Sequence, residues 1–360
     1  MHSLLPTRQL SFQHRKKRNI MQKKFKTKVL SCSDEDIKIA AQLICSSQVV
    51  GMPTETVYGL AADATDSLAV SRIFVAKGRP SDNPLIVHIS SMSMLSDIVE
   101  EIPELAVKCA EAFWPGPLTM VLPKKNIIPP VTSGGLDTVG VRFPSDETAR
   151  KLISFSGKPL AAPSANLSGS PSPTTAKHVF DDMNGRIPAI IDGGSCNVGV
   201  ESTVISFDGD AIRLLRPGFV SVEMLSEITE NIIIDKGVLE QLALNAKVSS
   251  PGMKYKHYSP KADIYIIKSD YDSFVRYVNE NKQSGDAVML FDGEAEIDEV
   301  KTVFYGETSQ QQAQRVFGAL RECDEIGAKR VFARCPSTEG VGLAVYNRLL
   351  RAAGFKLIEL

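Results

Sequence analysis

The order of helix-like and strand-like segments changes once along this chain of 360 residues. Up to about residue 230 the two kinds of segment are mixed without strict alternation, and the first two helices are expected after Ser33 and after Asp66. Beyond about residue 262, strand-like runs such as DIYIIKS and KRVFARC alternate with helical segments. The irregular order favours a twisted, mixed or mostly antiparallel sheet with helices around it, whereas regular alternation is typical of a parallel α/β sheet.

The expected elements lead to a division of the chain into four parts. Short apolar runs predict strands at 49–52, 85–89, 118–122, 138–143, 159–163, 188–191, 202–207 and 211–215, and further helices are expected at 103–113, 146–156, 174–183 and 221–230. The polar stretch KVSSPGMKYKHYSPKA, residues 247–262, predicts a long linker because proline and glycine interrupt it. The predicted parts are an N-terminal extension (1–32), a larger α/β domain (33–230), a linker (231–261) and a smaller α/β domain of parallel type (262–360).

Composition narrows the class of protein. A length of 360 residues with 43% apolar content is typical of a globular chain with two domains. No run of 18 or more apolar residues is present, and the N-terminus lacks the apolar core of a secretory signal, so we expect a cytoplasmic protein without a membrane span. The six cysteines never form a C-x-x-C spacing, and no His, Cys and carboxylate set has the spacing of a metal site.

The charge is distributed unevenly. Residues 1–33 carry nine Lys and Arg and no acidic residue, which leaves 32 basic against 42 acidic residues and a net charge of about −10 for the remainder. The basic tail is either an idle extension upstream of a second start at Met21, or a nucleic-acid contact or organelle address. An acidic body argues against a polyanion lying along the surface, because neutralisation of phosphates dominates nucleic-acid affinity.

The familiar phosphate-binding motifs are absent from the sequence. There is no G-x-x-x-x-G-K-[ST] loop, the nearest approach to G-x-G-x-x-G is Gly340-Val341-Gly342 without a third glycine, and no G-x-S-x-G elbow is present. A nucleotide would therefore have to be bound by other means.

Three polar segments are candidates for that role. In VAKGRPSDNPLIVHIS, residues 75–90, Lys77 at a helix end and Arg79 in the next loop place two cations close together, with Ser81 and Asn83 as neutral donors. Lys77 could equally be an ordinary charge at a helix C-terminus, and Arg79 a solvated loop residue. As surface-type cations, both are expected to be replaceable by alanine with loss of function and little change in thermal stability.

The second and third segments carry hydroxyl groups and a further cation. APSANLSGSPSPT, residues 162–174, follows a strand and offers Ser and Asn donors suited to phosphate or carboxylate oxygens, although a plain Ser/Pro-rich turn has the same composition. In ESTVISFDGDAIRLLRPG, Ser202 begins one strand and Arg216 ends its partner, which alone indicates only a hairpin. Arg142 lies on an apolar strand, where its charge needs a partner and a ligand anion is one candidate.

Taken together, these segments resemble a known family. The resemblance is carried by PTETVYGL (53–60), KGRP (77–80), NPLIVH (83–88), PSAN (163–166), and ESTV (201–204) followed by LRPG (215–218). They are similar to the motifs of the Sua5/YrdC/YciO family, and in particular of its two-domain Sua5-type threonylcarbamoyl-AMP synthases. The similarity runs from about residue 33 to the C-terminus and includes SPGMKYKHYSP (250–260) and EGVGLAVYNRLLRAA (339–353).

The resemblance implies a fold and an activity. The fold would be a YrdC-like twisted open mixed sheet with surrounding helices, joined by a long linker to a smaller Rossmann-like domain. The enzyme would be a nucleotidyltransferase that converts L-threonine, bicarbonate and ATP, with Mg²⁺, into threonylcarbamoyl-adenylate and pyrophosphate. The adenylate would pass to a separate tRNA threonylcarbamoyl transferase complex, which forms N6-threonylcarbamoyladenosine in tRNA. Such chemistry depends on positioning and phosphate neutralisation rather than on a covalent intermediate.

The resemblance also implies roles for individual residues. The threonine pocket would be formed by Thr56, His88, Arg142, Ala162 and Ser202. ATP would be contacted by Lys77, Arg79, Asn83, Thr138, Ser164, Asn166, Ser172, Arg216 and Tyr255. Lys77 and Arg79 would be the catalytic cations on the triphosphate, and Tyr255 would close over the site as part of a lid.

Two alternatives remain open. One is an RNA-binding YrdC/YciO-like protein without this activity, which would contact double-stranded RNA or tRNA through a concave basic cavity. The acidic body argues against it. The other is a YciO-like protein of unknown activity, against which the second domain and its linker argue.

Overall fold

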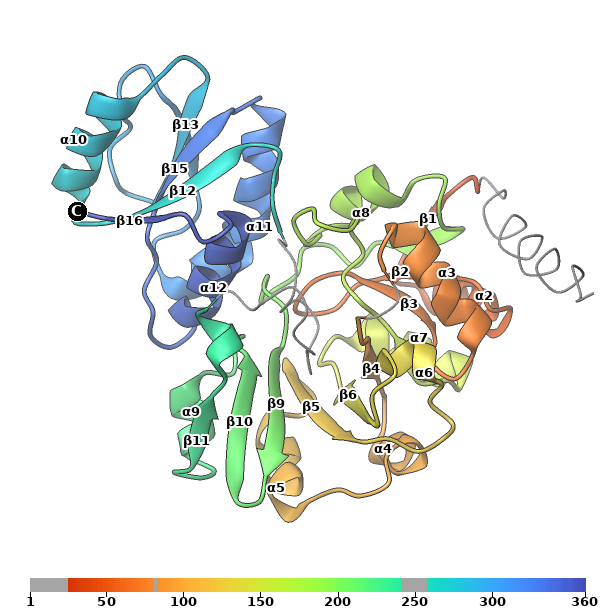
Figure 1. Ribbon diagram of the computed structural model, residues 1–360. Helices are drawn as coiled ribbons and strands as arrows, with labels where there is room; N and C mark the ends of the chain where they lie inside the picture. The colour runs from red at the N-terminus through yellow and green to blue at the C-terminus, as the bar shows by residue number, and fades with distance from the viewer. Residues whose placement is uncertain (1–24, 81–82, 241–257) are drawn as a thin grey trace, which may run out of the picture.

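The computed structural model describes residues 25–80, 83–240 and 258–360, which form two α/β units, each built on its own sheet (Figure 1). Eleven strands form the larger sheet: β1 (Lys28–Leu30), β2 (Val50–Met52), β3 (Gly59–Asp63), β4 (Ile86–His88), β5 (Leu118–Pro123), β6 (Thr138–Arg142), β7 (Leu160–Ala161), β8 (Ala189–Ile191), β9 (Thr203–Asp208), β10 (Ala211–Arg216) and β11 (Ile232–Ile234). Its helices are α2 (Asp34–Cys45), α3 (Ser67–Lys77), α4 (Met92–Ile98), α5 (Glu104–Phe113), α6 (Pro130–Ser133), α7 (Glu147–Ser156), α8 (Ala176–Met183) and α9 (Val222–Ser226), with a 3₁₀ turn at Lys236–Val238.

The larger sheet is mixed, as the irregular order of segments predicted. Its strand order is β1-β8-β2-β3-β7-β4-β6-β5-β9-β10-β11, with five parallel and five antiparallel pairings among the described strands. Strand β3 was not expected, because its sequence GLAAD is rich in the small residues that strands disfavour. Its complete burial between β2 and β7 outweighs that preference.

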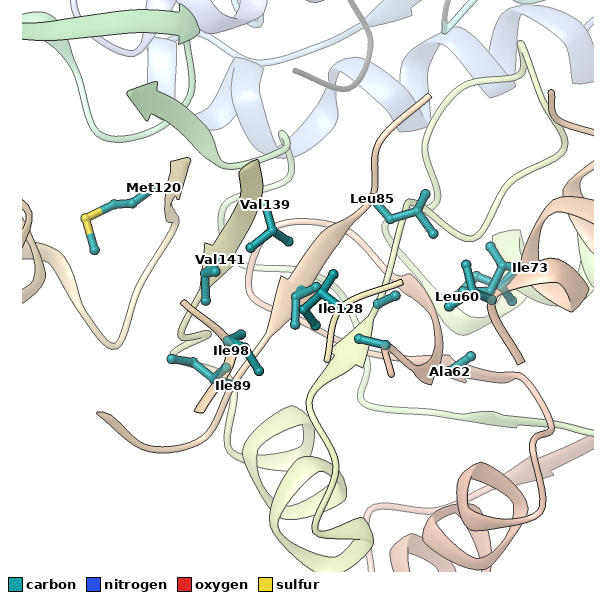
Figure 2. Close-up of a cluster of buried hydrophobic side chains, with 14 of the residues drawn as sticks. Leu60, Ala62, Ile73, Leu85, Ile89, Ile98, Met120, Ile128, Val139 and Val141 are labelled. Carbon is teal, nitrogen blue, oxygen red and sulfur yellow. The ribbon is translucent and has the colours of Figure 1, made fainter. Parts of the chain in front are cut away.

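The core of the larger unit lies between the sheet and its helices. Buried aliphatic side chains from β3, α3, β4, β5 and β6 meet there, and they include Leu60, Ile73, Leu85, Met120 and Val141 (Figure 2). Burial of this much apolar surface provides most of the favourable free energy of folding. The core holds the ends of β4 and β6 in place, and these strand ends carry polar residues.

Local signals set the position of α3. Asp66 caps its N-terminus by accepting a hydrogen bond from the Leu68 amide, and Gly78 ends it with a left-handed φ of +63°. Both signals were read from the sequence, and they place Lys77 in the last turn, directly before the loop that contains Arg79.

The smaller unit has the predicted parallel sheet. Its strands are β12 (Asp263–Lys268), β13 (Asp286–Leu290), β14 (Lys301–Phe304), β15 (Arg330–Arg334) and β16 (Leu357–Glu359), in the order β14-β13-β15-β12-β16, and its described pairings are all parallel. Its helices are α10 (Tyr271–Asn281), α11 (Ser309–Glu325) and α12 (Gly342–Ala352). The expected fold class of a mixed-sheet unit and a smaller parallel α/β unit is confirmed.

The two units share a core. Helices α11 and α12 pack on the face of the smaller sheet that is turned toward the larger unit (Figure 1), and Val57 and Val200 of the larger unit belong to the apolar cluster beneath them. The remaining helix of the smaller unit, α10, packs within a separate cluster with Phe274 and Val278. The contact between the units is therefore partly a hydrophobic core and not only a polar surface.

Two predicted boundaries differ from the structure. Strand β1 falls inside the range 1–32 that was set apart as an extension, since Lys28–Leu30 pairs in parallel with β8. Strand β11 falls inside the predicted linker 231–261, since Ile232–Ile234 pairs in parallel with β10. Both are three-residue edge strands, too short to show the alternation by which strands are recognised. In the described ranges, the helices include none with the length and apolar character needed to cross a membrane.

The loop before β9 lies so close to α11 that only glycine fits at one position. Gly199 has a φ of +80°, and a Cβ atom there would lie 2.3 Å from the Gln314 Cα. The neighbouring contact is a hydrogen bond of 2.6 Å from the Gln314 side-chain amide to the Asn197 carbonyl. The close approach makes this loop part of the interface between the units.

We predict that Gly199→Ala lowers the melting temperature more than Gly194→Ala. Gly194 lies in the same loop with a φ of +77° but open space around it, so alanine there meets only the backbone penalty of about 1 kcal/mol. Alanine at position 199 adds a steric cost of about 1–3 kcal/mol. Thermal unfolding of both variants measures the difference, and equal losses would contradict a close contact at Gly199.

Candidate active site

A single buried cavity gathers most of the residues predicted for the site. It encloses about 750 Å³ of space not filled by atoms, including open solvent at its mouth. The predicted residues that line it are Thr56, Lys77, Arg79, His88, Arg142, Ala162, Ser164, Asn166, Ser202 and Arg216. They come from segments far apart in the sequence, which the sheet brings together.

Three predicted residues of the described chain do not line this cavity. Thr138 lies in an adjoining hollow with Thr119 and Val204, and the Ser172 hydroxyl is buried and donates to Glu201 Oε1 at 2.6 Å. Asn83 is buried beside the cavity, and within the described chain its Oδ1 has no hydrogen-bond partner. Tyr255 lies outside the described residues, so its predicted role as a lid stays a prediction.

Arg142 is held by three protein groups at the end of β6. Its guanidinium donates to Thr56 Oγ1 at 2.7 Å and to the Gly116 carbonyl at 3.3 Å, and it forms an ion pair with Glu55 at 2.8 Å. Although burial alone would raise the pKa of Glu55, the charge of Arg142 holds it below its usual value. Within the described chain, Arg142 Nη2 is paired with Glu55 by charge but makes no hydrogen bond, so its two N–H groups remain for a ligand carboxylate.

His88 lies next to Arg142, because the parallel register of β4 and β6 pairs these two residues. Its side chain is 3% exposed, and within the described chain its Nδ1 has no hydrogen-bond partner. Burial, together with the charge of Arg142, lowers the pKa of His88 to about 3. A neutral imidazole therefore faces the cavity at physiological pH, where it can exchange hydrogen bonds without adding charge.

Lys77 is enclosed by carbonyl oxygens. Its ammonium donates to the Asn166 carbonyl at 2.9 Å and to the Ser164 carbonyl, and its side chain is only 3% exposed. Burial and the charge of Arg79 lower the pKa of Lys77 well below its usual value. The expectation that Lys77 is a surface-type cation is wrong, because the loop 162–174 folds over the end of α3.

Arg216 belongs to a second cluster, at the ends of β9 and β10. Its Nε and Nη2 donate to the Ser202 carbonyl at 3.1 and 3.0 Å, and Nη2 also donates to Ser202 Oγ at 3.1 Å. Ser202 Oγ lies 2.8 Å from Thr119 Oγ1. Burial lowers the pKa of Arg216 to about 10, which still leaves the guanidinium charged. A cation fixed in this way needs little reorganisation to meet an anion.

Sequence reasoning missed several residues of the site. Glu55 and Glu201 lie inside the recognised motifs but were not assigned roles, although buried carboxylates are expected beside buried arginines. Tyr258, which packs in the apolar cluster of the smaller unit, also lines the cavity. Its place in the KHYSP stretch was the only sequence feature that pointed to a role in the site. Arg348 also contacts the cavity wall, yet nothing in its sequence context pointed to Glu201. In the described part of the chain, no group of three or more His, Cys, Asp or Glu could hold a metal ion.

The architecture and the cavity together define a class of protein: two-unit α/β proteins with a buried, cation-lined pocket suited to small anionic ligands. Two family models match the chain. One, described as "Telomere recombination" for Sua5, YciO and YrdC proteins, matches residues 42–218, and a second, "Threonylcarbamoyl-AMP synthase, C-terminal domain", matches residues 220–354.

Individual relatives match over nearly the whole chain. The threonylcarbamoyl-AMP synthase of Pyrococcus abyssi is 46% identical over 328 residues, which are 90% of this chain and 95% of that protein. The Bacillus subtilis protein of the same name is 44% identical over 339 residues, 92% of this chain and 97% of its own. The crystal structure of P. abyssi Sua5 complexed with L-threonine is 42% identical, with a TM-score of 0.86 over 93% of this chain and 100% of that one. The chain therefore belongs to the Sua5/YrdC/YciO family, among its two-domain threonylcarbamoyl-AMP synthases.

We predict that His88 makes the protein sensitive to mild acid. The unfolded chain binds a proton at His88 near pH 6.5 and the folded protein only near pH 3, so the unfolded state binds more protons between these values and stability rises with pH across that window. Between pH 7.5 and pH 5.0 this residue should account for a loss of about 2 kcal/mol.

Denaturant unfolding of the wild type and of His88→Asn at both pH values tests this prediction. The variant should show the smaller loss of unfolding free energy between pH 7.5 and 5.0, because it has no imidazole to protonate. An identical pH dependence in the two proteins would show that His88 is not held neutral by burial.

Proposed function

We propose that this chain is an L-threonylcarbamoyl-AMP synthase that uses L-threonine, bicarbonate and ATP to make threonylcarbamoyl-adenylate and pyrophosphate for tRNA modification. The observation that carries the proposal is that one buried cavity has two parts. One contains the neutral His88 beside Arg142, and the other contains the cations Lys77, Arg79 and Arg216 with several hydroxyl groups. The high identity to synthases over almost the full chain supports the same activity.

The part around Arg142 suits the amino acid. The two remaining N–H groups of Arg142 would bind the threonine carboxylate, while His88 and Thr56 would face its polar side chain or amine. Ala162 and Ser202, which also line the cavity, would complete this part of the wall. The complex of P. abyssi Sua5 with L-threonine supports such a pocket.

The part around Lys77 suits the triphosphate. Lys77, Arg79 and Arg216 would neutralise the phosphates, with Ser164 and Asn166 as further contacts from the loop that encloses Lys77. Proximity to phosphate would raise the pKa of Lys77 again and keep it charged. Thr138, Ser172 and Asn83 would act from the edge of this part. Mg²⁺ would arrive with ATP, coordinated by phosphate oxygens and water, as is usual for this ion.

The reaction then needs only positioning and charge neutralisation. The threonine amine adds to carbon dioxide derived from bicarbonate, which forms a carbamate. A carbamate oxygen attacks the α-phosphorus, a new O–P bond forms, and the bond to the leaving pyrophosphate breaks. The cations of the cavity would stabilise the charge on the departing phosphates. Transfer of the product to a tRNA-modifying complex, contact with tRNA and a cytoplasmic location stay predictions.

We predict pyrophosphate release from ATP that requires both L-threonine and bicarbonate. Lys77→Met should reduce this release at least 100-fold, because the variant keeps the volume of the buried chain but removes its charge. Lys177→Met is the matched control, since Lys177 is an exposed residue of α8 paired with Asp181. Release that does not depend on threonine, or none at all, would refute the synthase and favour an RNA-binding protein without this activity.

We predict that Arg142→Lys weakens L-threonine binding about 10-fold and leaves ATP affinity within twofold. Lysine keeps a positive charge beside Glu55 but loses the planar fork that binds a carboxylate through two hydrogen bonds. Isothermal titration calorimetry with each substrate measures both affinities. Unchanged threonine affinity would exclude Arg142 from the amino-acid pocket.

A further inference from the structure

Arg348 is a fully buried arginine of α12 whose guanidinium leaves its own unit and enters the cavity wall of the other. Its Nε donates to Glu201 Oε2 at 2.6 Å, and its Nη2 donates to the carbonyls of Pro217 at 3.0 Å and Glu201 at 3.4 Å. Its Nη1 donates to Asn347 Oδ1 at 2.7 Å, and the side chain is 0% exposed. No other described ion pair buries its cation so completely.

These contacts surround two predicted site residues. Glu201 directly precedes Ser202 in the chain, and Pro217 directly follows Arg216. The other oxygen of the Glu201 carboxylate accepts the hydrogen bond from Ser172. Arg348 of the smaller unit therefore contacts the immediate chain neighbours of Ser202 and Arg216. Through Glu201 it is also linked to Ser172.

Glu201 brings a negative charge close to the place where an anionic ligand would bind. Its carboxylate belongs to the cavity lining, where it would repel phosphates. Burial alone would raise the pKa of Glu201. The charges of the nearby Arg348 and Arg216 nevertheless hold this pKa below its usual value. Arg348 forms the ion pair with Glu201 at 2.6 Å, whereas Arg216 donates its hydrogen bonds to Ser202.

Within the proposed function, we propose that Arg348 is a positioning residue for ATP: it neutralises Glu201 and prevents this carboxylate from capturing Arg216. The smaller unit thereby completes the nucleotide side of the cavity. A buried carboxylate that lost Arg348 would be left with Arg216 as its nearest charged partner, because an unpaired buried charge is strongly unfavourable.

A second interunit arginine, Arg321, holds the loop 162–174. Arg321 of α11 forms an ion pair with Asp182 at 2.9 Å and donates to the Pro171 carbonyl at 2.6 Å. Asp182 Oδ2 also accepts from the Leu167 amide at 3.2 Å. Residues 167 and 171 adjoin Asn166 and Ser172, so the smaller unit holds the loop 162–174 as well as Glu201.

The test compares Arg348→Met with the double variant Arg348→Met/Glu201→Gln. We expect Arg348→Met to raise the Kd of Mg-ATP at least 10-fold, with L-threonine affinity within twofold of the wild type. Removing the carboxylate should release Arg216, so the double variant should recover most of the lost ATP affinity and pyrophosphate release. A purely structural role for Arg348 would lower the melting temperature and weaken both ligands together, whereas the proposed role predicts a loss confined to ATP.

Arg334→Met is the matched control. Arg334 is buried and forms an ion pair with the half-buried Glu294 at 2.9 Å, within the smaller unit and not among the residues that line the cavity, so its loss should leave ATP affinity unchanged. Circular dichroism checks that each variant is folded. If Arg348→Met does not fold, Arg348→Lys, which keeps the charge, should bind ATP with an affinity much closer to that of the wild type than to a 10-fold loss.

Two outcomes would overturn the inference: unchanged ATP affinity in folded Arg348→Met, or a loss that Glu201→Gln does not relieve. Arg348→Lys with a loss of 10-fold or more would do the same. The proposed function fails separately, because it requires the wild type itself to release pyrophosphate only with threonine and bicarbonate present.

Discussion

The burial of positive charge against protein oxygen atoms is the constraint on which this site depends. Lys77, Arg142 and Arg216 all lie in the cavity wall, and each is held by carbonyl, hydroxyl or carboxylate oxygens of the chain itself. In a medium of low polarity, such charges would be prohibitively costly without these partners. The partners also fix the directions of the remaining N–H groups, so an anionic ligand meets donors that are already oriented.

The same constraint explains why the two units are packed together. The carboxylate of Glu201 needs a cation that does not belong to the ligand site, and α12 supplies it from the smaller unit. The shared core around Val57 and Val200 and the close approach at Gly199 bring α11 and α12 near enough for that contact. The smaller unit therefore contributes directly to the electrostatics of the cavity, although the motifs that identify the family are concentrated in the larger one.

Much of the fold could be predicted because local signals agreed with it. Asp66 and Gly78 delimit α3, and the alternating segments after residue 262 form the expected parallel sheet. The three-residue edge strands β1 and β11 could not be predicted, because pairing with β8 and β10 stabilises them rather than any pattern of their own. Strand β3 was missed for a related reason, since its small residues favour a strand only once both faces are covered.

The sequence by itself determined the chemistry available to the protein: which cations, hydroxyls and imidazole occur in which motifs, and hence the family. Only the tertiary structure decided the state of those groups. Lys77 is enclosed rather than solvated, His88 is neutral because it is buried beside Arg142, and Glu201 is paired with an arginine 147 residues away. Burial and long-range contact decide such states, and neither is encoded in the spacing of residues along a motif.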